Sequence, residues 1–238
     1  MPMKMTLLAT AATGLLAIAA PAHATTTINL GGSAGSGSSG NSIVFTGGGT
    51  TVTASGWSID NAGNVHEGAL GQWSNGLGVI NGRTDNSHTV DNVGWTDFVL
   101  FQFDSVVSLD SASFSTGWDL LFDSDATIGF ANLGGAFTGN LAGFSFGNSP
   151  GSLFGSGTRP INVLGGTGNT WIIGAAGGHT DIFPDGFKIG TIGFSPVSGA
   201  VPEPSTWAFM LLGFGFAGAA MRRRKGQQVR TNAAISFA

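Results

Sequence analysis

The sequence contains neither cysteine nor tyrosine, and only 9% of its 238 residues are charged. Without cysteine, the chain can form no disulfide, no thiolate metal site and no thiol nucleophile. Soluble globular domains usually have about 25% charged residues, and surface helices carry many of them on their solvent face. The composition therefore argues against an ordinary cytosolic enzyme and against a helical bundle.

Positive charge is scarce in the long central part of the chain. Residues 25–201 contain three basic and twelve acidic residues, a net charge of −9, whereas residues 202–238 have one acidic and five basic residues, a net charge of +4. Nucleic-acid binding requires clustered Lys and Arg, so we expect no nucleic-acid partner. Glycine is abundant, with 41 residues, and it costs about 1 kcal/mol relative to alanine inside a helix.

The first 24 residues have the composition of a secretory signal peptide. Lys4 precedes an apolar stretch from Leu7 to Ala20, and Ala22-His23-Ala24 then supplies the small residues of a cleavage site. An N-terminal core helix is the alternative, but Pro21 and the polar sequence after Ala24 disfavour it. We expect cleavage after Ala24 and an exported, extracytoplasmic protein.

A second apolar run lies near the C-terminus. Sixteen uncharged residues, Thr206 to Met221, would form a helix roughly 24 Å long, slightly shorter than a hydrocarbon core of about 30 Å. Three of them are glycines, which are commoner in membrane helices than in soluble ones. The cluster Arg222, Arg223, Arg224 and Lys225 would hold the end of the run in the cytoplasm. The pattern predicts one transmembrane helix over residues 206–221.

The residues in front of this run are Pro202, Glu203 and Pro204, whose proline rings favour an extended backbone. Together with the apolar helix and the basic cluster, they make residues 201–225 resemble the PEP-CTERM sorting signal. The resemblance implies export by a bacterium that makes extracellular polysaccharide, and an inner-membrane exosortase that recognises and cuts the tail. The chain would then be the substrate, and residues 226–238 a cytoplasmic extension.

The resemblance also implies a route through the cell. The chain would be inserted in the inner membrane before processing, and its body would then reach the cell surface or the extracellular matrix. We accordingly expect a structural or adhesive role in exopolysaccharide or biofilm, with extracellular polysaccharide as a further partner.

Residues 42–194 show no sustained helical period. Short apolar or alternating runs, separated by Gly, Ser and Asn, predict an all-β body, a single β-sandwich resembling a jelly roll. Phe98–Phe101 is apolar on both faces and should be a central strand, whereas Ala112–Ser115 alternates and should be half exposed. Residues 25–41 read as a Gly/Ser-rich lead-in and residues 195–200 as a spacer. The runs are Ser42–Thr46, Thr50–Ala54, Gly78–Ile80, Phe98–Phe103, Val106–Leu109, Ala112–Ser115, Thr127–Phe130, Trp171–Ile173 and Phe187–Phe194.

The densest acidic stretch contains Asp119, Asp123 and Asp125. Carboxylate and amide oxygens are ligands that calcium prefers, and Asp91 and Asn92 could complete a loop site. The stretch lacks the glycine and the final glutamate of an EF-hand loop. A calcium site is one interpretation, and solvated turn carboxylates are the other.

Nothing in the sequence predicts a catalytic site. His66, His88 and His179 are isolated, without the spacing of a zinc motif. No pair of carboxylates is singled out for glycoside hydrolysis, and Gly-x-Ser-x-Gly occurs only in low-complexity segments. We therefore expect no enzyme. The alternative to a structural role is a calcium-dependent carbohydrate-binding module, in which Trp57, Trp73, Trp95, Trp118 or Trp171 could stack on sugars.

Overall fold

The fold was analysed in a computed structural model, which divides the chain into two units. One unit is His23–Gly199, and the other comprises Met1–Ala22 and Ala200–Ala238. The structure describes residues 25–32, 37–38, 40–81, 88–116, 122–152, 155–177, 183–197, 209–219 and 221–222. The predicted signal peptide, residues 1–24, lies outside the described residues.

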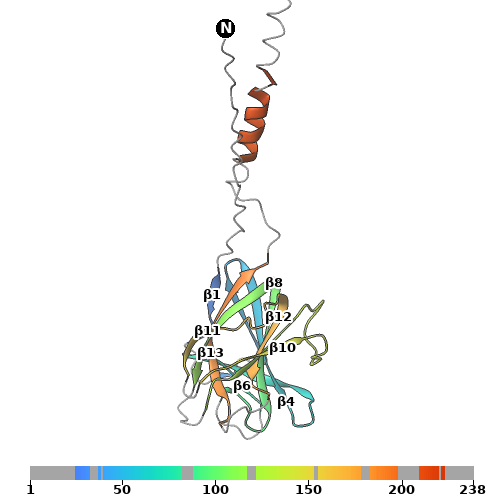
Figure 1. The fold of residues 1–238 in the computed structure, drawn as a ribbon. Coiled ribbons are helices and arrows are strands. Elements are labelled where there is room, and N and C mark those ends of the chain that lie inside the picture. Colours follow the sequence, from blue (N-terminus) through green and yellow to red (C-terminus); the bar gives the residue numbers. More distant parts are fainter. Residues whose placement is uncertain are drawn as a thin grey trace, which may run out of the picture. The chain divides into compact units, whose positions relative to one another are not determined.

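The described part of the body is all-β, as the sequence predicts, and its strands form one antiparallel sheet (Figure 1). The strand order is β1-β13-β6-β5-β4-β8-β12-β9-β10, with β11, β2, β3 and β7 paired to β8, β5, β4 and β13. The strands are β1 (Thr26–Asn29), β2 (Gly37–Ser38), β3 (Ser42–Gly47), β4 (Thr50–Ile59), β5 (Val65–Trp73), β6 (Gly76–Ile80), β7 (Val90–Asp91), β8 (Thr96–Thr116), β9 (Ala126–Ala131), β10 (Ser145–Ser149), β11 (Gly157–Pro160), β12 (Gly168–Ala175) and β13 (Gly186–Pro196).

The long strand β8 bends the sheet around its core. Its first part, residues 96–103, pairs with β4 and β12, and residues 107–116 pair with β13. Strand β5 makes a similar change, since it pairs with β4 and then with β6. Because β13 also pairs with β6, the strands β4, β8, β13, β6 and β5 form a closed circuit. The strands paired with the first part of β8 and those paired with its second part thus belong to one sheet.

Two hydrophobic clusters lie on opposite faces of β8, which explains why Phe98–Phe101 is apolar throughout. Side chains alternate between the faces of a strand. Val99 and Phe101 enter the main core, whereas Phe98 and Leu100 join a second cluster outside it. The β9–β10 connection covers this second cluster with Phe137, Leu141 and Phe144. Strand β8 is central in the sheet, as predicted.

The sequence-based runs include none of β1, β2, β5, β7, β10 and β11. Strand β1 lies within the predicted lead-in, where Ile28 and, just after the strand, Leu30 are buried in the core. Strand β5 contains two glycines, which interrupt the alternation of apolar and polar residues that predicts a strand. One of them is required by packing, because a side chain at Gly71 would collide with the Trp73 ring. Glycine inside a strand often marks such a close approach. Here it makes room for an aromatic ring.

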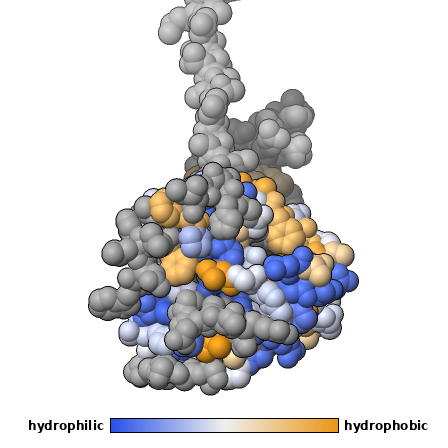
Figure 2. All heavy atoms as spheres, turned by 90° about the horizontal axis from the view of Figure 1, so that it is seen from below, coloured by the Kyte–Doolittle hydropathy of each residue, from blue (hydrophilic) through white to orange (hydrophobic). Residues whose placement is uncertain are grey.

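The exposed hydrophobic side chains of the body are spread over several strands and loops, and include Val44, Phe146 and Leu164. On the face shown in Figure 2, hydrophobic and hydrophilic residues are interspersed. On this face, polar side chains thus separate the hydrophobic ones, although few residues of the body are charged.

The second unit is described only at residues 209–219 and 221–222, which are helical. Its hydrophobic side chains are exposed all around the helix, with Phe209, Leu211 and Phe216 each more than 70% accessible. Among the described residues, no helix has both the length and the hydropathy needed to cross a membrane. Residues 206–208 and 220 of the predicted span lie outside the described residues.

Shortening Phe101 tests the main core. Phe101 is fully buried on β8, so Phe101→Ala leaves a cavity and should lower the free energy of unfolding by about 3–5 kcal/mol. Val44→Ala is the control, because Val44 is 62% exposed and should change stability by less than about 0.5 kcal/mol. Chemical denaturation measures both. Equal effects of the two substitutions would contradict the core assignment.

Candidate functional site

Three carboxyl groups meet where two connections of the sheet lie side by side. Asp123 and Asp125 precede β9, and Asp185 precedes β13. One oxygen of each lies within 4.8 Å of the other two, so the group could hold a metal ion. Asp123 and Asp185 are only 4% and 3% exposed. The cluster thus joins two of the predicted ligands to one carboxylate that the sequence did not single out.

Backbone hydrogen bonds hold the two connections together. Asp123 and Asp185 form an isolated parallel bridge, in which the Asp123 N–H donates to Pro184 O over 3.1 Å and the Gly186 N–H donates to Asp123 O over 2.9 Å. The Asp125 N–H donates to Asp123 Oδ1 over 2.8 Å, as in an Asx turn. The positions of the carboxylates are therefore fixed by main-chain contacts.

Asn92, a predicted ligand, supports this cluster from the β7–β8 connection. Its Nδ2 donates to Asp185 Oδ2 over 2.6 Å, and its Oδ1 accepts from the Asp185 N–H over 3.0 Å. The same Nδ2 donates to Ala176 O over 3.2 Å. Because both ends of the amide are engaged, Asn92 orients Asp185.

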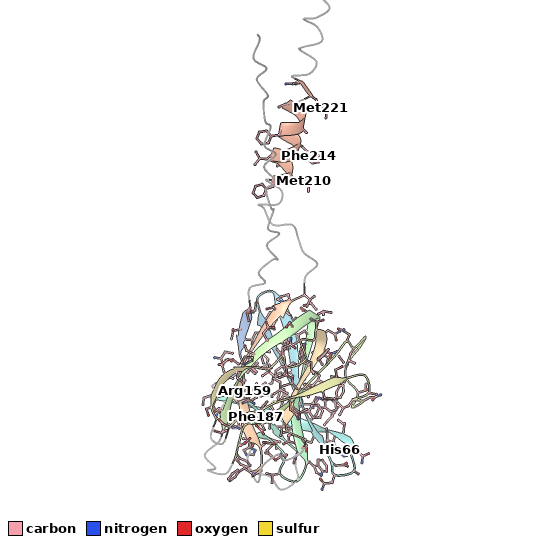
Figure 3. All side chains as sticks on the ribbon, in the orientation of Figure 1. His66, Arg159, Phe187, Met210, Phe214 and Met221 are labelled. Atoms are coloured by element: carbon pink, nitrogen blue, oxygen red, sulfur yellow. The ribbon has the colours of Figure 1, made fainter. Side chains whose placement is uncertain are left out.

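Arg159 supplies a positive charge close to the cluster. Its guanidinium donates to the carbonyl and hydroxyl oxygens of Ser124 and to those of Ser149. It also lies over the Phe114 ring, 3.8 Å from the centroid, and Phe114 packs edge-on against Phe187. Arg159 and Phe187 are labelled in Figure 3. Burial lowers the pKa of Arg159, while the charges of Asp125 and Asp123 oppose that change. The charge of Arg159 thus interacts with two of the three carboxyl groups, those of Asp123 and Asp125.

The excess of carboxyl groups affects Asp185 most. Burial, the hydrogen bond with Asp123 and the charges of Asp123 and Asp125 together raise the pKa of Asp185 to about 8. Without another cation, Asp185 therefore retains a proton at neutral pH. A divalent cation would favour all three ionised forms. The donors are all hard oxygens, which suit calcium or magnesium and not a metal that prefers thiolate or imidazole.

The two other predicted calcium ligands, Asp119 and Asp91, are not part of the described carboxylate cluster. Asp119 lies outside the described residues. Asp91 is fully buried, and its carboxylate accepts from Thr89 Oγ1 over 2.8 Å and from the Val93 N–H over 3.0 Å. Burial lowers the pKa of Lys188 to about 8, and the charge of Asp91 opposes this shift. Asp91 thus acts electrostatically on Lys188.

The described histidines and tryptophans make mainly structural contacts. His66 lies 2.9 Å from Asp60 and stacks on Trp95, and His88 stacks on Trp73. The Lys188 ammonium group lies 3.8 Å from the centroid of the Trp73 ring. Trp57 and Trp171 are buried, and Trp118 and His179 lie outside the described residues. Of the described tryptophans, only Trp73 and Trp95 retain appreciable exposure.

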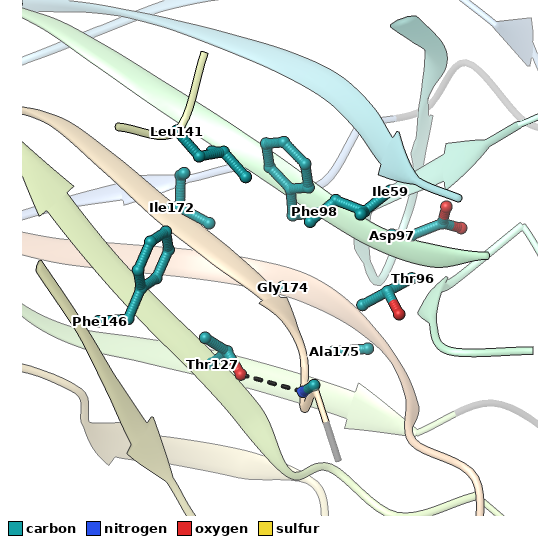
Figure 4. A pocket seen from close by; sticks show the side chains of 11 residues that line it. Ile59, Thr96, Asp97, Phe98, Thr127, Leu141, Phe146, Ile172, Gly174 and Ala175 are labelled. Carbon is teal, nitrogen blue, oxygen red and sulfur yellow. Dashed lines mark hydrogen bonds between the residues drawn. The ribbon is translucent and has the colours of Figure 1, made fainter. Parts of the chain in front are cut away.

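A small depression of about 90 Å³ lies beside the second hydrophobic cluster (Figure 4). Phe98, Leu141 and Ile172 line it, and Phe146 of β10 forms another part of its wall. At its edge Thr127 Oγ1 accepts from the Gly177 N–H over 3.2 Å. A lining so poor in polar groups suits an apolar group better than a sugar ring.

Comparison with known proteins identifies the C-terminal segment. The family described as PEP-CTERM protein-sorting motif matches residues 200–225, which confirms the resemblance of the tail. Neither a curated protein nor a solved structure is significantly similar to the chain. The motif implies an exported protein sorted by an exosortase through a membrane-anchored intermediate. Its residues Pro202, Glu203 and Pro204, and the cations Arg223–Lys225, lie outside the described residues.

The raised pKa of Asp185 predicts a pH dependence of stability in the presence of a chelator. The folded protein keeps a proton on Asp185 that the unfolded chain releases near pH 3.8. This group should therefore lower the melting temperature as pH rises from about 4 to 8, with no further loss above that range. Asp185→Asn should flatten this profile, whereas Asp104→Asn, at an exposed site, should retain it. An unchanged slope in Asp185→Asn would contradict the assignment.

Proposed function

We propose that this chain is a structural or adhesive protein of an extracellular polysaccharide matrix, delivered by exosortase sorting, with a body that is not an enzyme. The observation that carries the proposal is the PEP-CTERM motif at residues 200–225. Two sequence features support it. The first 24 residues have the pattern of a signal peptide, and the acidic body has no charge pattern for a nucleic-acid partner.

The apolar surface of the described helix supports a membrane-anchored intermediate. Hydrophobic side chains project on all sides of residues 209–219, and a helix of this kind is suited to lipid or to a protein interior. With the adjoining residues it makes up the proposed span 206–221, which the basic cluster from Arg222 to Lys225 would orient. The extended Pro202-Glu203-Pro204 segment would then lie next to the membrane surface, where an exosortase could bind it.

Replacing Pro202, Glu203 and Pro204 together by Ala, Gln and Ala tests the sorting function. We expect the body to stay in the membrane fraction as an uncleaved chain, because the extended acidic segment that the exosortase binds is lost. Cell fractionation with intact-mass measurement, in cells with and without the exosortase, reports both location and cleavage.

The matched control replaces Gln227 and Gln228 by Ala, outside the matched motif. This variant should be processed and released like the unaltered protein. Normal release of the triple variant, with the same mature mass, would refute the role of the Pro-Glu-Pro segment.

Calcium-dependent carbohydrate binding is a second candidate function, favoured by the carboxylate cluster. Asp123, Asp125 and Asp185 would bind the ion, which would join the β8–β9 and β12–β13 connections. Waters or backbone oxygens would complete the six to eight ligands that calcium takes. Polysaccharide contact would then come from loops that the ion orders, with Trp73 and Trp95 as the partly exposed aromatic residues.

Calcium addition tests this second function. At a calcium concentration of 100 times Kd, linkage should stabilise the protein by about 2.7 kcal/mol, which raises Tm by roughly 5–10 °C for a chain of this size. Asp123→Asn with Asp125→Asn should abolish the shift, and Asp104→Asn should preserve it. Calorimetry that detects no heat, together with an unchanged Tm, would exclude the site. Retention on a polysaccharide column that a chelator does not reduce would exclude calcium dependence of the binding, and absence of retention would exclude the carbohydrate role.

A further inference from the structure

Strand β10 is an open edge of the sheet. It ends the strand order and pairs on one side with β9, and no other described strand pairs with its second side. Ser145, Phe146 and Asn148 are exposed there. Unpaired N–H and C=O groups along an edge can accept a further strand.

The usual protection of an edge strand is missing at β10. Proteins commonly place Lys, Pro or inward-pointing charges on such strands. Strand β10 has none, and residues 126–158 form a run of 33 without Asp, Glu, Lys, Arg or His. By contrast, the short strand β11 carries Arg159 and Pro160, and β1, at the other end of the order, is covered where Gly47 and Gly48 of the β3–β4 hairpin approach Ile28 and Thr26.

Apolar side chains flank both faces of this edge. On one face Phe146, 45% exposed, stacks on Phe144 with 5.9 Å between ring centroids and borders the apolar depression (Figure 4). On the other face, exposed Val163 and Leu164 pack over Gly147, where an added Cβ would lie 2.8 Å from Val163 Cγ2. A strand placed against β10 would therefore cover apolar surface on both faces.

The distribution of charge on the body favours this edge over the rest of the surface for a contact between two copies of the chain. The body carries a net charge of −9, so two copies repel each other over most of their surfaces. The repulsion is weakest where both copies present the uncharged segment 126–158. We propose that β10 pairs antiparallel with β10 of a second copy of this chain, across a two-fold axis.

Such a pairing is self-complementary. In an isologous contact the same patch is used twice, and each β10 offers the other its unpaired backbone groups. Pairing centred on Gly147 sets Phe146 opposite Asn148 of the second copy and places both Phe146 side chains on one face. The contact ends near Ser149, whose carbonyl oxygen accepts from Arg159. The sheet would continue from one body into the next, independently of the sorting of the chain.

Single cysteines test this contact cleanly, since the chain has none of its own. The full-length Asn148→Cys protein, purified in mild detergent and treated with a short bismaleimide, should form a crosslinked dimer, because the two introduced cysteines are diagonal neighbours roughly 7–8 Å apart on one face, too far for a direct disulfide. Val44→Cys, on exposed strand β3, is the matched control. The pairing should make the Asn148→Cys crosslink at least about tenfold faster, because association raises the effective thiol concentration. Denaturing electrophoresis measures the rates.

A positive charge introduced on the β10 edge provides a second test of the contact. Ser145→Lys in the Asn148→Cys background puts a cation on each copy at the contact, and the crosslinking rate should fall to that of Val44→Cys. Ser42→Lys, an equal charge on β3, should leave the rate unchanged. Thermal melting confirms that each variant is folded. Equal rates for Asn148→Cys and Val44→Cys, as association through the chain ends would give, or a rate unaffected by Ser145→Lys, would overturn the proposal.

Discussion

The backbone pairing of β8 is the interaction on which the rest of the body depends. Its 21 residues bond to β4 and β12 in one half and to β13 in the other, so the same strand belongs to both walls of the core. Phe101 and Phe98 extend from opposite faces of β8 into the two hydrophobic clusters. The packing of this strand therefore also sets how far apart the two walls lie. A break in β8 would leave the two walls joined only through β5 and β6 among the described strands, because no other described strand pairs with both β4 and β13.

The same strand arranges the carboxylate cluster. Asn92 lies just before β8 and Asp123 follows it, while Asp185 precedes β13, the partner of its second half. Residues far apart in the sequence thus meet at one end of the sheet. The like charges assembled there are tolerated because Arg159 lies nearby and Asp185 keeps a proton.

Sequence reasoning succeeded where a local pattern carries the structure. The apolar run Phe98–Phe101 predicted a central strand, and the Pro-Glu-Pro segment with its helix and basic cluster predicted the sorting motif. It could not separate β5 from a loop, because two glycines interrupt the alternation, Gly71 against the Trp73 ring and Gly68 against Val79. Three predicted runs in β8 are one strand, since the exposed residues Asp104–Val106 only mark its bend. Asp185 was missed because only the topology brings it beside Asp123.

The position of β13 at the end of the body has a mechanical consequence. The tail follows β13 in the chain, so a pull on a membrane-anchored tail would enter the body through this strand. Strand β13 is paired with β8 from Phe187 to Pro196 and with β1 on its other side. A pull along its axis must slide β13 past both neighbours and break many backbone hydrogen bonds together. The strand that leads to the anchor is thus loaded in shear, the direction in which a sheet resists force best.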